Sequence, residues 1–266
     1  KYAKVGTRVY LENLDGYVRF VLDGTTVTAD TSQERKINSY ASYDKIAEAW
    51  LLSAHPDGPS AVASGKHSGL LFDQYINRVG RDILGWKCSH AQDFPLLIKM
   101  IDAADDLSVQ VHPDDEYAMA KESQYGKNEM WYVIDSSEGA GLYVGFKKDV
   151  SEEEVRNAIE DGTVTDLLNF VPTHKGDVFF IPAGTVHAIG KGNLILEVQQ
   201  SSNCTYRLYD FDRKDRYGNK RELHLDKALD VLSKLKPSAL YQKVSYNCFM
   251  RLDKMLANAE LVSLIK

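Results

Sequence analysis

Gln110 and His112 are the first residues of this chain whose types and spacing could bind a metal ion. They are separated by one residue and stand directly before Pro113, which ends the β-prone segment Leu107–Val111. Alternate residues of a strand point to the same face, so the amide and the imidazole are expected to project together. A Gln-x-His pair alone is weak support, because a single histidine is more often a core or surface residue than a ligand.

Glu129 begins the next β-prone segment and is expected to share one face with Trp131 and Val133. A carboxylate on the same face as these apolar side chains is unusual for a solvated surface. Inside a barrel its burial is tolerated only where a cation compensates the charge. The position of Glu129 therefore predicts a buried cation beside it.

His187 ends a run with the spacing G-x5-P-x-G-x2-H that starts at Gly176. The Pro-x-Gly turn is expected to reverse the chain after an apolar strand, so that His187 enters the interior on the next strand. Two imidazoles, one carboxylate and one amide oxygen suit zinc at about 2.0–2.2 Å per ligand. Iron, manganese and cobalt also accept such donors. We therefore predict one metal ion per chain, with zinc preferred, and four ligands: Gln110, His112, Glu129 and His187.

The elements that must position these residues are mostly short strands. Strands are predicted over Arg8–Leu14, Tyr17–Leu22, Thr25–Ala29, Ile46–Ala54, Leu96–Ala103, Leu107–Val111, Glu129–Asp135, Gly141–Phe146, Asp177–Ile181, Leu194–Gln200 and Cys204–Tyr209. Helices are predicted over Leu70–Gly80, Arg81–Leu84, Ser151–Asp161, Thr163–Leu168 and Leu223–Leu235. Many short strands with few helices favour a barrel or a double-sheet jelly roll. Glycine-rich nucleotide-binding loops are missing from the sequence.

The composition is that of an ordinary globular protein, with 44% hydrophobic and 26% charged residues among 266. The formal net charge of -6 argues against a nucleic-acid partner, since phosphate backbones require a basic surface. Three widely spaced cysteines fit reduced thiols, and the apolar runs are too short to span a bilayer. We therefore expect a cytoplasmic protein with a small-molecule substrate and with no nucleic-acid, membrane or obligatory protein partner.

Four segments around the predicted ligands resemble the type I phosphomannose isomerases of the short bacterial class, which belong to the cupin superfamily. The segments are Ser108–Asp115, Gly126–Trp131, Pro182–Ala188 and Leu196–Asn203. The resemblance covers about residues 45–235 and is most specific between Leu107 and Arg213. It implies a mainly β cupin fold, a jelly-roll β-barrel with a few short helices, together with a second barrel that binds no metal. It also implies that zinc is held by the four residues named above.

The reaction implied by the resemblance is the interconversion of mannose 6-phosphate and fructose 6-phosphate. A proton moves between C1 and C2 of the open-chain sugar through a cis-enediol(ate). Zinc can polarise the sugar oxygens, and a positioned base must carry the proton. Two other functions stay open, namely another metal cupin enzyme such as a dioxygenase, and a non-catalytic sensor of sugar phosphates. Dioxygenases usually present His-x-His rather than Gln-x-His, which favours the isomerase.

Three residues are candidate catalytic groups because they match positions of the family: Arg207, Lys127 and Glu197. Arg207 matches the active-site arginine, a permanent cation suited to stabilising an enediolate. Its alternative interpretation is a surface arginine paired with Asp210 or Asp212. Lys127 stands two residues before the glutamate ligand and is expected to face the same way. Glu197 is a candidate proton carrier, with a structural role as its alternative.

Two further residues are candidate phosphate contacts by the same resemblance. Ser108 is expected to face the same way as Gln110, and Arg213 falls where family members place a basic residue. The sequence around Arg213 varies more than the rest of the match, so this assignment is the weaker one. Asn203 stands where the family usually has aspartate, and an amide cannot ionise to carry a proton. That difference keeps the sensor interpretation open.

The predicted domain organisation has three parts. Residues 1–45 form a β-meander of uncertain assignment, residues 46–215 form the metal-binding cupin domain, and residues 216–266 form a helix and an incomplete second β-domain. The family's N-terminal Trp-Gly-Gly segment is not visible in the first part. One hypothesis is that strands of residues 8–29 complete the second barrel.

Overall fold

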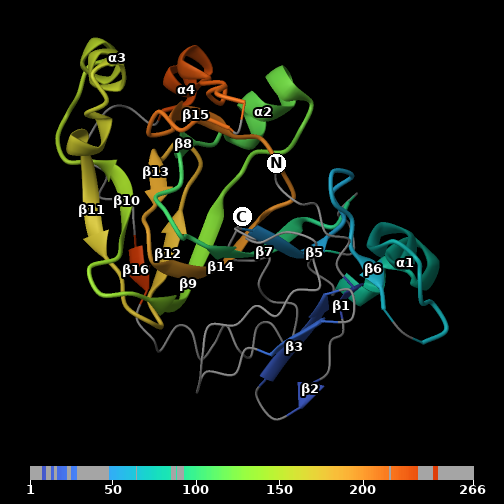
Figure 1. Cartoon of the computed structure of the whole chain (residues 1–266). Helices are drawn as coiled ribbons and strands as arrows, with labels where there is room; N and C mark the ends of the chain where they lie inside the picture. Colours follow the sequence, from blue (N-terminus) through green and yellow to red (C-terminus); the bar gives the residue numbers. More distant parts are fainter. Residues whose placement is uncertain are drawn as a thin grey trace. The chain divides into compact units, whose positions relative to one another are not determined.

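A computed structural model describes residues 48–63, 65–84, 88, 93–215 and 217–232, together with the backbone of strands β1 to β4 and β16. The chain divides into two compact units (Figure 1). One unit is formed largely by Lys1–Met100 and the other by Ile101–Asp253. All the predicted site residues belong to the second unit.

One sheet of the second unit is five-stranded and antiparallel, with the order β11-β10-β13-β8-β15. Its strands are β8 Val109–Val111, β10 Gly141–Phe146, β11 Leu168–Pro172, β13 His187–Ile189 and β15 Tyr206–Tyr209. Strand β10 has the predicted bounds, and β8 and β15 were predicted with slightly longer bounds. β13 is the strand on which His187 was expected. β11 was not predicted as a strand.

The other sheet of the unit pairs β16, β12, β9 and β14 in that order, again antiparallel. Its strands are β9 Glu129–Ser136, β12 Val178–Ile181, β14 Asn193–Gln200 and β16 Gln242–Val244. The three predicted strands among them are confirmed to within one or two residues at each end.

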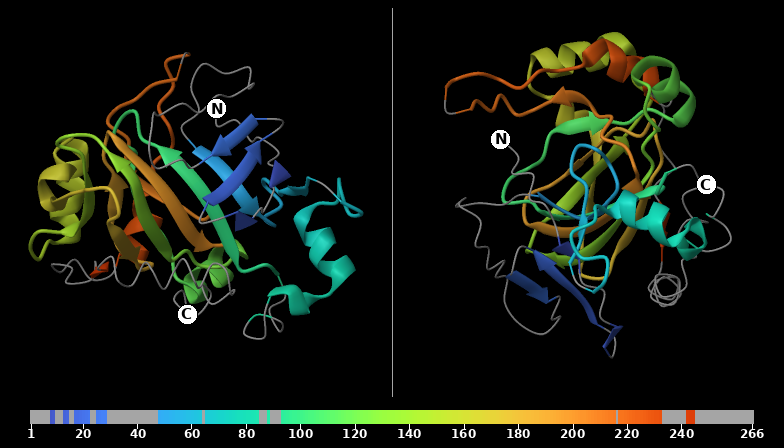
Figure 2. Two further views of the ribbon diagram at one scale, coloured as in Figure 1. Left: turned by 90° about the horizontal axis from the view of Figure 1, so that it is seen from below. Right: turned by 90° about the vertical axis from the view of Figure 1, so that its right-hand side faces the viewer.

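The two sheets face each other across an apolar core (Figure 2). Every second residue of a strand contributes to this core, as the period of two requires. Its fully buried members include Trp131, Val133, Leu142, Val144, Phe179 and Ile195. This arrangement confirms the predicted mainly β, jelly-roll architecture.

Helices gather at one end of the second unit (Figures 1 and 2). They are α2 Asp115–Glu122, α3 Glu152–Glu160, the 3₁₀ helix η2 Val164–Leu167 and α4 Leu225–Val231. The hydroxyl of Ser151 accepts from the backbone N–H of Glu154 and so caps α3, as its sequence predicts. α2 was not predicted, although Asp114 caps it by accepting from the N–H of Tyr117.

The described part of the first unit contains short strands, an α-helix and a 3₁₀ helix. β2 Asn13–Leu14, β3 Tyr17–Leu22 and β4 Thr25–Thr28 form the predicted antiparallel meander. The expected first strand Arg8–Leu14 is wrong in part, because β1 Arg8–Val9 pairs in parallel with β6 Ala61–Val62. The remaining elements are β5 Glu48–Ser53, α1 Phe72–Val79 and the 3₁₀ helix η1 Arg81–Leu84. The division between the two units falls within β7 Leu96–Asp102, after Met100.

The predicted second barrel falls largely outside the described residues, because beyond residue 224 only residues 225–232 and the backbone of β16 are described. The predicted division at residues 45 and 215 likewise stays a prediction. None of the helices in the described part is long and apolar enough to cross a membrane.

Candidate metal centre

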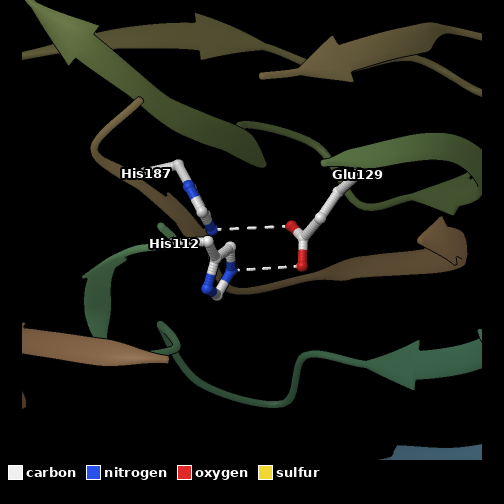
Figure 3. Close-up of side chains that lie close together, drawn as sticks. All are labelled: His112, Glu129 and His187. Carbon is white, nitrogen blue, oxygen red and sulfur yellow. Dashed lines mark ion pairs between the residues drawn. The ribbon is translucent and has the colours of Figure 1, made fainter. Parts of the chain in front are cut away.

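His112, Glu129 and His187 point toward one another between the two sheets (Figure 3). The ring Nε2 of His112 lies 3.1 Å from Oε1 of Glu129, and the ring Nε2 of His187 lies 3.5 Å from Oε2. One ligand atom from each residue lies within 4.8 Å of the other two, and all three side chains are buried. The structure thus brings together three of the four predicted ligands as a group that can hold a metal ion.

Gln110 lies beside this group through strand register. In the five-stranded sheet His187 on β13 stands directly opposite Gln110 on β8. The amide Nε2 of Gln110 is 3.4 Å from Nε2 of His187. Since the two ends of a glutamine amide exchange by rotation, the amide oxygen can take the same position. Its part as fourth ligand is therefore compatible with the geometry and stays a prediction.

Both imidazoles are oriented by backbone carbonyls. The ring Nδ1 of His112 is 3.0 Å from the carbonyl of Cys204, and that of His187 is 2.9 Å from the carbonyl of Thr185. A carbonyl can only accept, so each Nδ1 carries the proton and donates it. Each Nε2 then has a lone pair on the side of Glu129. Metal-binding histidines use this tautomer, in which one ring nitrogen donates to a neighbouring acceptor and the other binds the metal.

The polar atoms at the centre of the group fit a cation. Nε2 of His112 and both carboxylate oxygens of Glu129 are buried and lack a hydrogen bond of good geometry within the described part of the chain, although Oε1 lies 3.0 Å from the ammonium of Lys127 as an ion pair. An unsatisfied buried polar atom costs about 1–3 kcal/mol. A divalent cation would satisfy all three atoms at once, since imidazole nitrogen and carboxylate oxygen are ordinary ligands of such ions.

The protonation states of the group also fit a cation. Burial, aided by the charge of Lys127, lowers the pKa of His112 to about 3. Burial lowers the pKa of His187 as well. Burial alone would raise the pKa of Glu129, but Lys127 and His112 hold it well below its usual range. Neutral imidazoles and an ionised carboxylate are the forms that bind metal.

Lys127 lies within the same buried group. Its ammonium is 3.0 Å from Oε1 of Glu129 and 3.5 Å from the hydroxyl of Thr205, and the side chain is buried. A lysine ammonium has three donors, so it can contact a bound molecule in addition to these two partners. This position agrees with the expectation that Lys127 shares the facing of the glutamate ligand.

Glu197 is linked to the predicted ligand His187 through the side chain of Trp131. On β14 it stands opposite Trp131 of β9, and its Oε2 accepts a 2.9 Å hydrogen bond from the indole N–H. The same indole packs edge-on against the ring of His187, with the ring centroids 5.2 Å apart. Trp131 is a fully buried core residue, and its indole also joins Glu197 to His187, which the sequence did not reveal.

Arg207 belongs to the same row of the five-stranded sheet as two ligands. On β15 it stands opposite Gln110, which in turn stands opposite His187. Side chains of such directly paired residues share a face. Its guanidinium donates to the carbonyl of Glu222, and its backbone N–H donates to Nδ1 of His224. The row places Arg207 on the face that carries the metal group.

Comparisons with known proteins show what this chain is similar to. Residues 24–139 match the family model described as "Phosphomannose isomerase type I, catalytic domain". A mannose-6-phosphate isomerase of Streptococcus mutans serotype c is 49% identical over 195 residues, which are 73% of this chain and 60% of that protein. Mannose-6-phosphate isomerase ManA of Bacillus subtilis is 45% identical over 189 residues, which are 71% of this chain and 59% of that protein.

Over 73% of its length the chain is similar to a type I phosphomannose isomerase relative, and the family model and the solved structures agree with that similarity. It spans about three fifths of the length of the curated relatives that it matches, 60% and 59% for the two named above. The crystal structure of the mannose 6-phosphate isomerase from Bacillus subtilis is 38% identical, with a TM-score of 0.65 over 75% of this chain and 61% of that one. The crystal structure of a zinc-bound mannose 6-phosphate isomerase is 17% identical, with a TM-score of 0.53. The match covers 73% of this chain and 67% of that one, and at this identity it shows a shared fold alone. This similarity confirms the resemblance seen in the sequence and the cupin-type fold that it implied.

The two phosphate contacts expected from the phosphomannose isomerase family are placed differently. Ser108 is buried and directly precedes β8, the strand that carries Gln110. The guanidinium of Arg213 instead pairs with the carboxylate of Asp210 and donates to the carbonyl of Asp106 at 2.6 Å. Asp210 also pairs with Arg221. These contacts engage the Arg213 guanidinium, so its role toward phosphate stays a prediction without structural support.

Asn203, which replaces the usual aspartate of the phosphomannose isomerases, is exposed. The residue that the sequence missed near the centre is Asn128, between Lys127 and Glu129. Its side chain accepts from the backbone N–H of Ala183, in the turn that precedes His187. An amide that bonds to a distant backbone segment follows no periodic pattern, so only the structure reveals this contact.

Proposed function

We propose that this chain carries the catalytic part of a mannose-6-phosphate isomerase, which interconverts mannose 6-phosphate and fructose 6-phosphate. The observation that carries the proposal is the buried group of His112, Glu129 and His187 with the ammonium of Lys127 on the carboxylate. The named relatives are mannose-6-phosphate isomerases, of which this chain spans 60% and 59%. The substrate is accordingly a sugar phosphate in its open-chain form.

The metal in this proposal is zinc, one ion per chain. His112, Glu129 and His187 would hold it, with the amide oxygen of Gln110 as fourth donor. Two imidazole nitrogens and a carboxylate are a donor set that zinc accepts. Zinc bound there supplies a Lewis acid beside the reacting carbonyl and hydroxyl oxygens of the sugar. A metal preference among zinc, iron, manganese and cobalt follows from availability as well as from donor type.

Lys127 and Glu197 are the proposed groups for the proton transfer between C1 and C2. The carboxylate of Glu197 is buried and held by the indole of Trp131, so it is kept in one orientation. A fixed carboxylate is suited to remove a carbon-bound proton and return it to the neighbouring carbon. Lys127 is suited to donate a hydrogen bond to a substrate oxygen, since Glu129 and Thr205 leave one of its three donors for it.

Arg207 is the proposed charge-stabilising residue. Its guanidinium cannot lose its proton in the physiological range, so it stays positive while negative charge develops on the sugar oxygens. The guanidinium donates a 2.8 Å hydrogen bond to the carbonyl of Glu222, which holds the side chain in place. Ser108 is proposed to contact the phosphate, and Arg213 is proposed for the same role with the weaker basis given above.

A coupled assay tests the proposal on the 266-residue chain loaded with zinc. Mannose 6-phosphate is supplied, and fructose 6-phosphate is detected through a dehydrogenase couple. We expect turnover that falls by about 10²–10³ in Arg207→Ala, the usual cost of removing a group that stabilises developing charge. Absence of turnover in the zinc-loaded wild type would refute the isomerase, and saturable sugar phosphate binding without turnover would indicate the sensor instead.

The proposal extends to cellular location and to domain limits. Cys204 forms no disulfide bond within the described part of the chain, which fits a reducing compartment. We therefore propose a cytoplasmic location. We also propose that residues 46–215 hold the metal and the catalytic groups, because every candidate of the site lies within them.

A further inference from the structure

Three short segments carry the predicted metal ligands other than Gln110. The first ligand segment, His112–Asp115, follows β8 and begins α2. The second ligand segment, Gly126–Glu129, ends at the carboxylate ligand. The third ligand segment, Pro182–His187, contains the Pro-x-Gly turn and ends at the second imidazole. These segments are far apart in sequence, so bonds between them decide how precisely the three ligand atoms are held.

Backbone hydrogen bonds join the first ligand segment to each of the others. The N–H of Lys127 donates to the carbonyl of Pro113 at 3.0 Å, which ties the second segment to the first. The N–H of Gly184 donates to the carbonyl of His112 at 2.7 Å, which ties the third segment to the first. Gly126 packs so closely on the first segment that a Cβ atom there would lie 2.4 Å from the backbone of Asp114.

The side chain of Asn128 joins the second ligand segment to the third. Its Oδ1 accepts a 2.9 Å hydrogen bond from the backbone N–H of Ala183. Together with the two backbone bonds, this contact makes a closed triangle of hydrogen bonds between the three segments. Asn128 is the member of the triangle that acts through a side chain, so it can be changed without altering the backbone.

Gln200 fixes the orientation of the Asn128 amide. Oε1 of Gln200 accepts from the backbone N–H and from the side-chain amide of Asn128, at 2.8 and 2.7 Å. Nε2 of Gln200 donates to Oδ1 of Asp115 at 3.1 Å. A carboxylate only accepts, so the NH₂ group of Gln200 must face Asp115 and its oxygen must face Asn128. The oxygen of Asn128 must then face Ala183, and every donor in the chain of bonds has an acceptor.

The direction of Asn128 separates this role from contact with substrate. Successive residues of an extended segment point to opposite sides. Lys127 and Glu129 point into the metal group and meet each other at 3.0 Å, whereas Asn128 between them points to the turn at Ala183 and to Gln200. Its effect on the site can therefore only pass through the ligands that it holds in place.

We propose that Asn128, oriented by Gln200, is a positioning residue that sets the affinity of the site for its metal ion. This inference rests on the proposed metal site. Outer groups that orient metal ligands typically change affinity by about 10–100-fold when they are removed. The triangle restrains the apoprotein as well, so its loss leaves the ligand atoms less well placed before the metal arrives.

The test measures zinc affinity by competition with a chromophoric chelator on the full chain. We expect Asn128→Ala to weaken zinc binding about 10-fold or more. Gln200→Met should weaken it by a smaller factor, and the double variant should bind zinc no more weakly than Asn128→Ala, because both changes open the same side of the triangle. Gln200→Met also serves if Asn128→Ala fails to fold.

The matched control is Asn169→Ala, which removes another half-buried asparagine whose amide donates to the carbonyl of Phe146 at 2.8 Å. We expect its zinc affinity to stay within about 2-fold of wild type even where its stability falls, since a buried hydrogen bond contributes about 1 kcal/mol. The absorption spectrum of the Co²⁺-loaded protein adds a second readout, because it reports ligand geometry and should change in Asn128→Ala alone of these two variants.

Three results would overturn the inference. Zinc affinity unchanged in Asn128→Ala would refute the positioning role, and so would an equal loss in Asn169→Ala. Wild type that binds no zinc would refute the metal site itself together with the inference. By contrast, tight zinc binding in a chain that does not turn over mannose 6-phosphate would refute the isomerase and leave the inference standing.

Discussion

Replacement of Lys127 by methionine should lower the stability of the apoprotein and raise its affinity for zinc. The Lys127 ammonium lies 3.0 Å from Oε1 of Glu129, and 4% and 0% of the two side chains are exposed. Lys127→Met leaves a buried carboxylate without its cation, which costs about 3–5 kcal/mol when one partner of a buried pair is removed. At an effective dielectric constant near 20, Coulomb's law gives about 5.5 kcal/mol for this distance, which is slightly above the upper end of that range.

A bound divalent cation would replace the lost charge. The ammonium also repels such a cation, so its removal should raise zinc affinity while it lowers the stability of the apoprotein. We expect denaturant unfolding in the presence of a chelator to show a loss of about 3–5 kcal/mol for Lys127→Met. Most of that loss should disappear when zinc is added in excess, because ligand binding to the native state adds stability by mass action.

Lys148→Met is the matched control for this experiment. Its ammonium makes a 2.6 Å ion pair with Glu154, but the two side chains are 63% and 36% exposed. An exposed pair of this kind contributes less than about 1 kcal/mol, with or without zinc. Equal stability of the wild-type and Lys127→Met apoproteins would refute the reasoning, and so would weaker zinc binding in Lys127→Met.

Three further changes probe the elements around the site. Gly126→Ala places a Cβ atom 2.4 Å from the backbone of Asp114, so we expect a loss of at least about 1–3 kcal/mol in denaturant unfolding and weaker zinc binding; wild-type values for both would contradict the close packing. Asp210→Asn removes a buried carboxylate whose pKa burial would raise but which two arginines hold below its usual range. Because its folded pKa lies below the unfolded value of about 3.9, its contribution is present above that pH and is lost as the pH falls through the folded pKa; the stability difference between wild type and Asp210→Asn should therefore shrink below about pH 4, and a constant difference would count against it. His224→Phe removes the acceptor for the backbone N–H of Arg207, so kcat for mannose 6-phosphate should fall, and His224→Asn, which offers an oxygen near the same place, should restore part of it; equal activity in the two variants would exclude this role.

The ligand group could be predicted from the sequence because each member stands in a local pattern. The strand period placed Gln110 and His112 on one face, and the Pro-x-Gly turn placed His187 on the following strand. Both patterns extend over only a few residues, so they can be recognised in the sequence without knowledge of the tertiary structure. The meeting of these segments with Glu129 followed from the resemblance to a known family rather than from periodicity.

Contacts between distant segments could not be predicted in the same way. The bond from Ala183 to Asn128 and the bond from Trp131 to Glu197 join residues 55 and 66 positions apart. Such pairs depend on sheet order and register, which a single sequence does not specify. Arg213 shows the same limit, because a nearby carboxylate, Asp210, engages the guanidinium that the family pattern assigned to phosphate.

Local sequence signals failed at two elements for different reasons. Helix α2 has a capping aspartate, Asp114, with acidic residues in its first turn, but its mixed polarity gives no apolar stripe to reveal it. The strand expected over Arg8–Leu14 contains the β-prone residues Val9 and Tyr10, yet β1 pairs with β6 and β2 pairs with β3. Propensity predicted the extended backbone there and could not predict its partners.

The dependence of turnover on zinc content tests the central claim most directly. Metal-free chain is titrated with zinc while the rate of conversion of mannose 6-phosphate is followed and the bound zinc is measured by elemental analysis. The account predicts a rate that rises in proportion to bound zinc and reaches its plateau at about one ion per chain, as expected for one closed set of protein ligands. Full turnover in chain proven free of metal, or no turnover with one zinc ion bound, would contradict it.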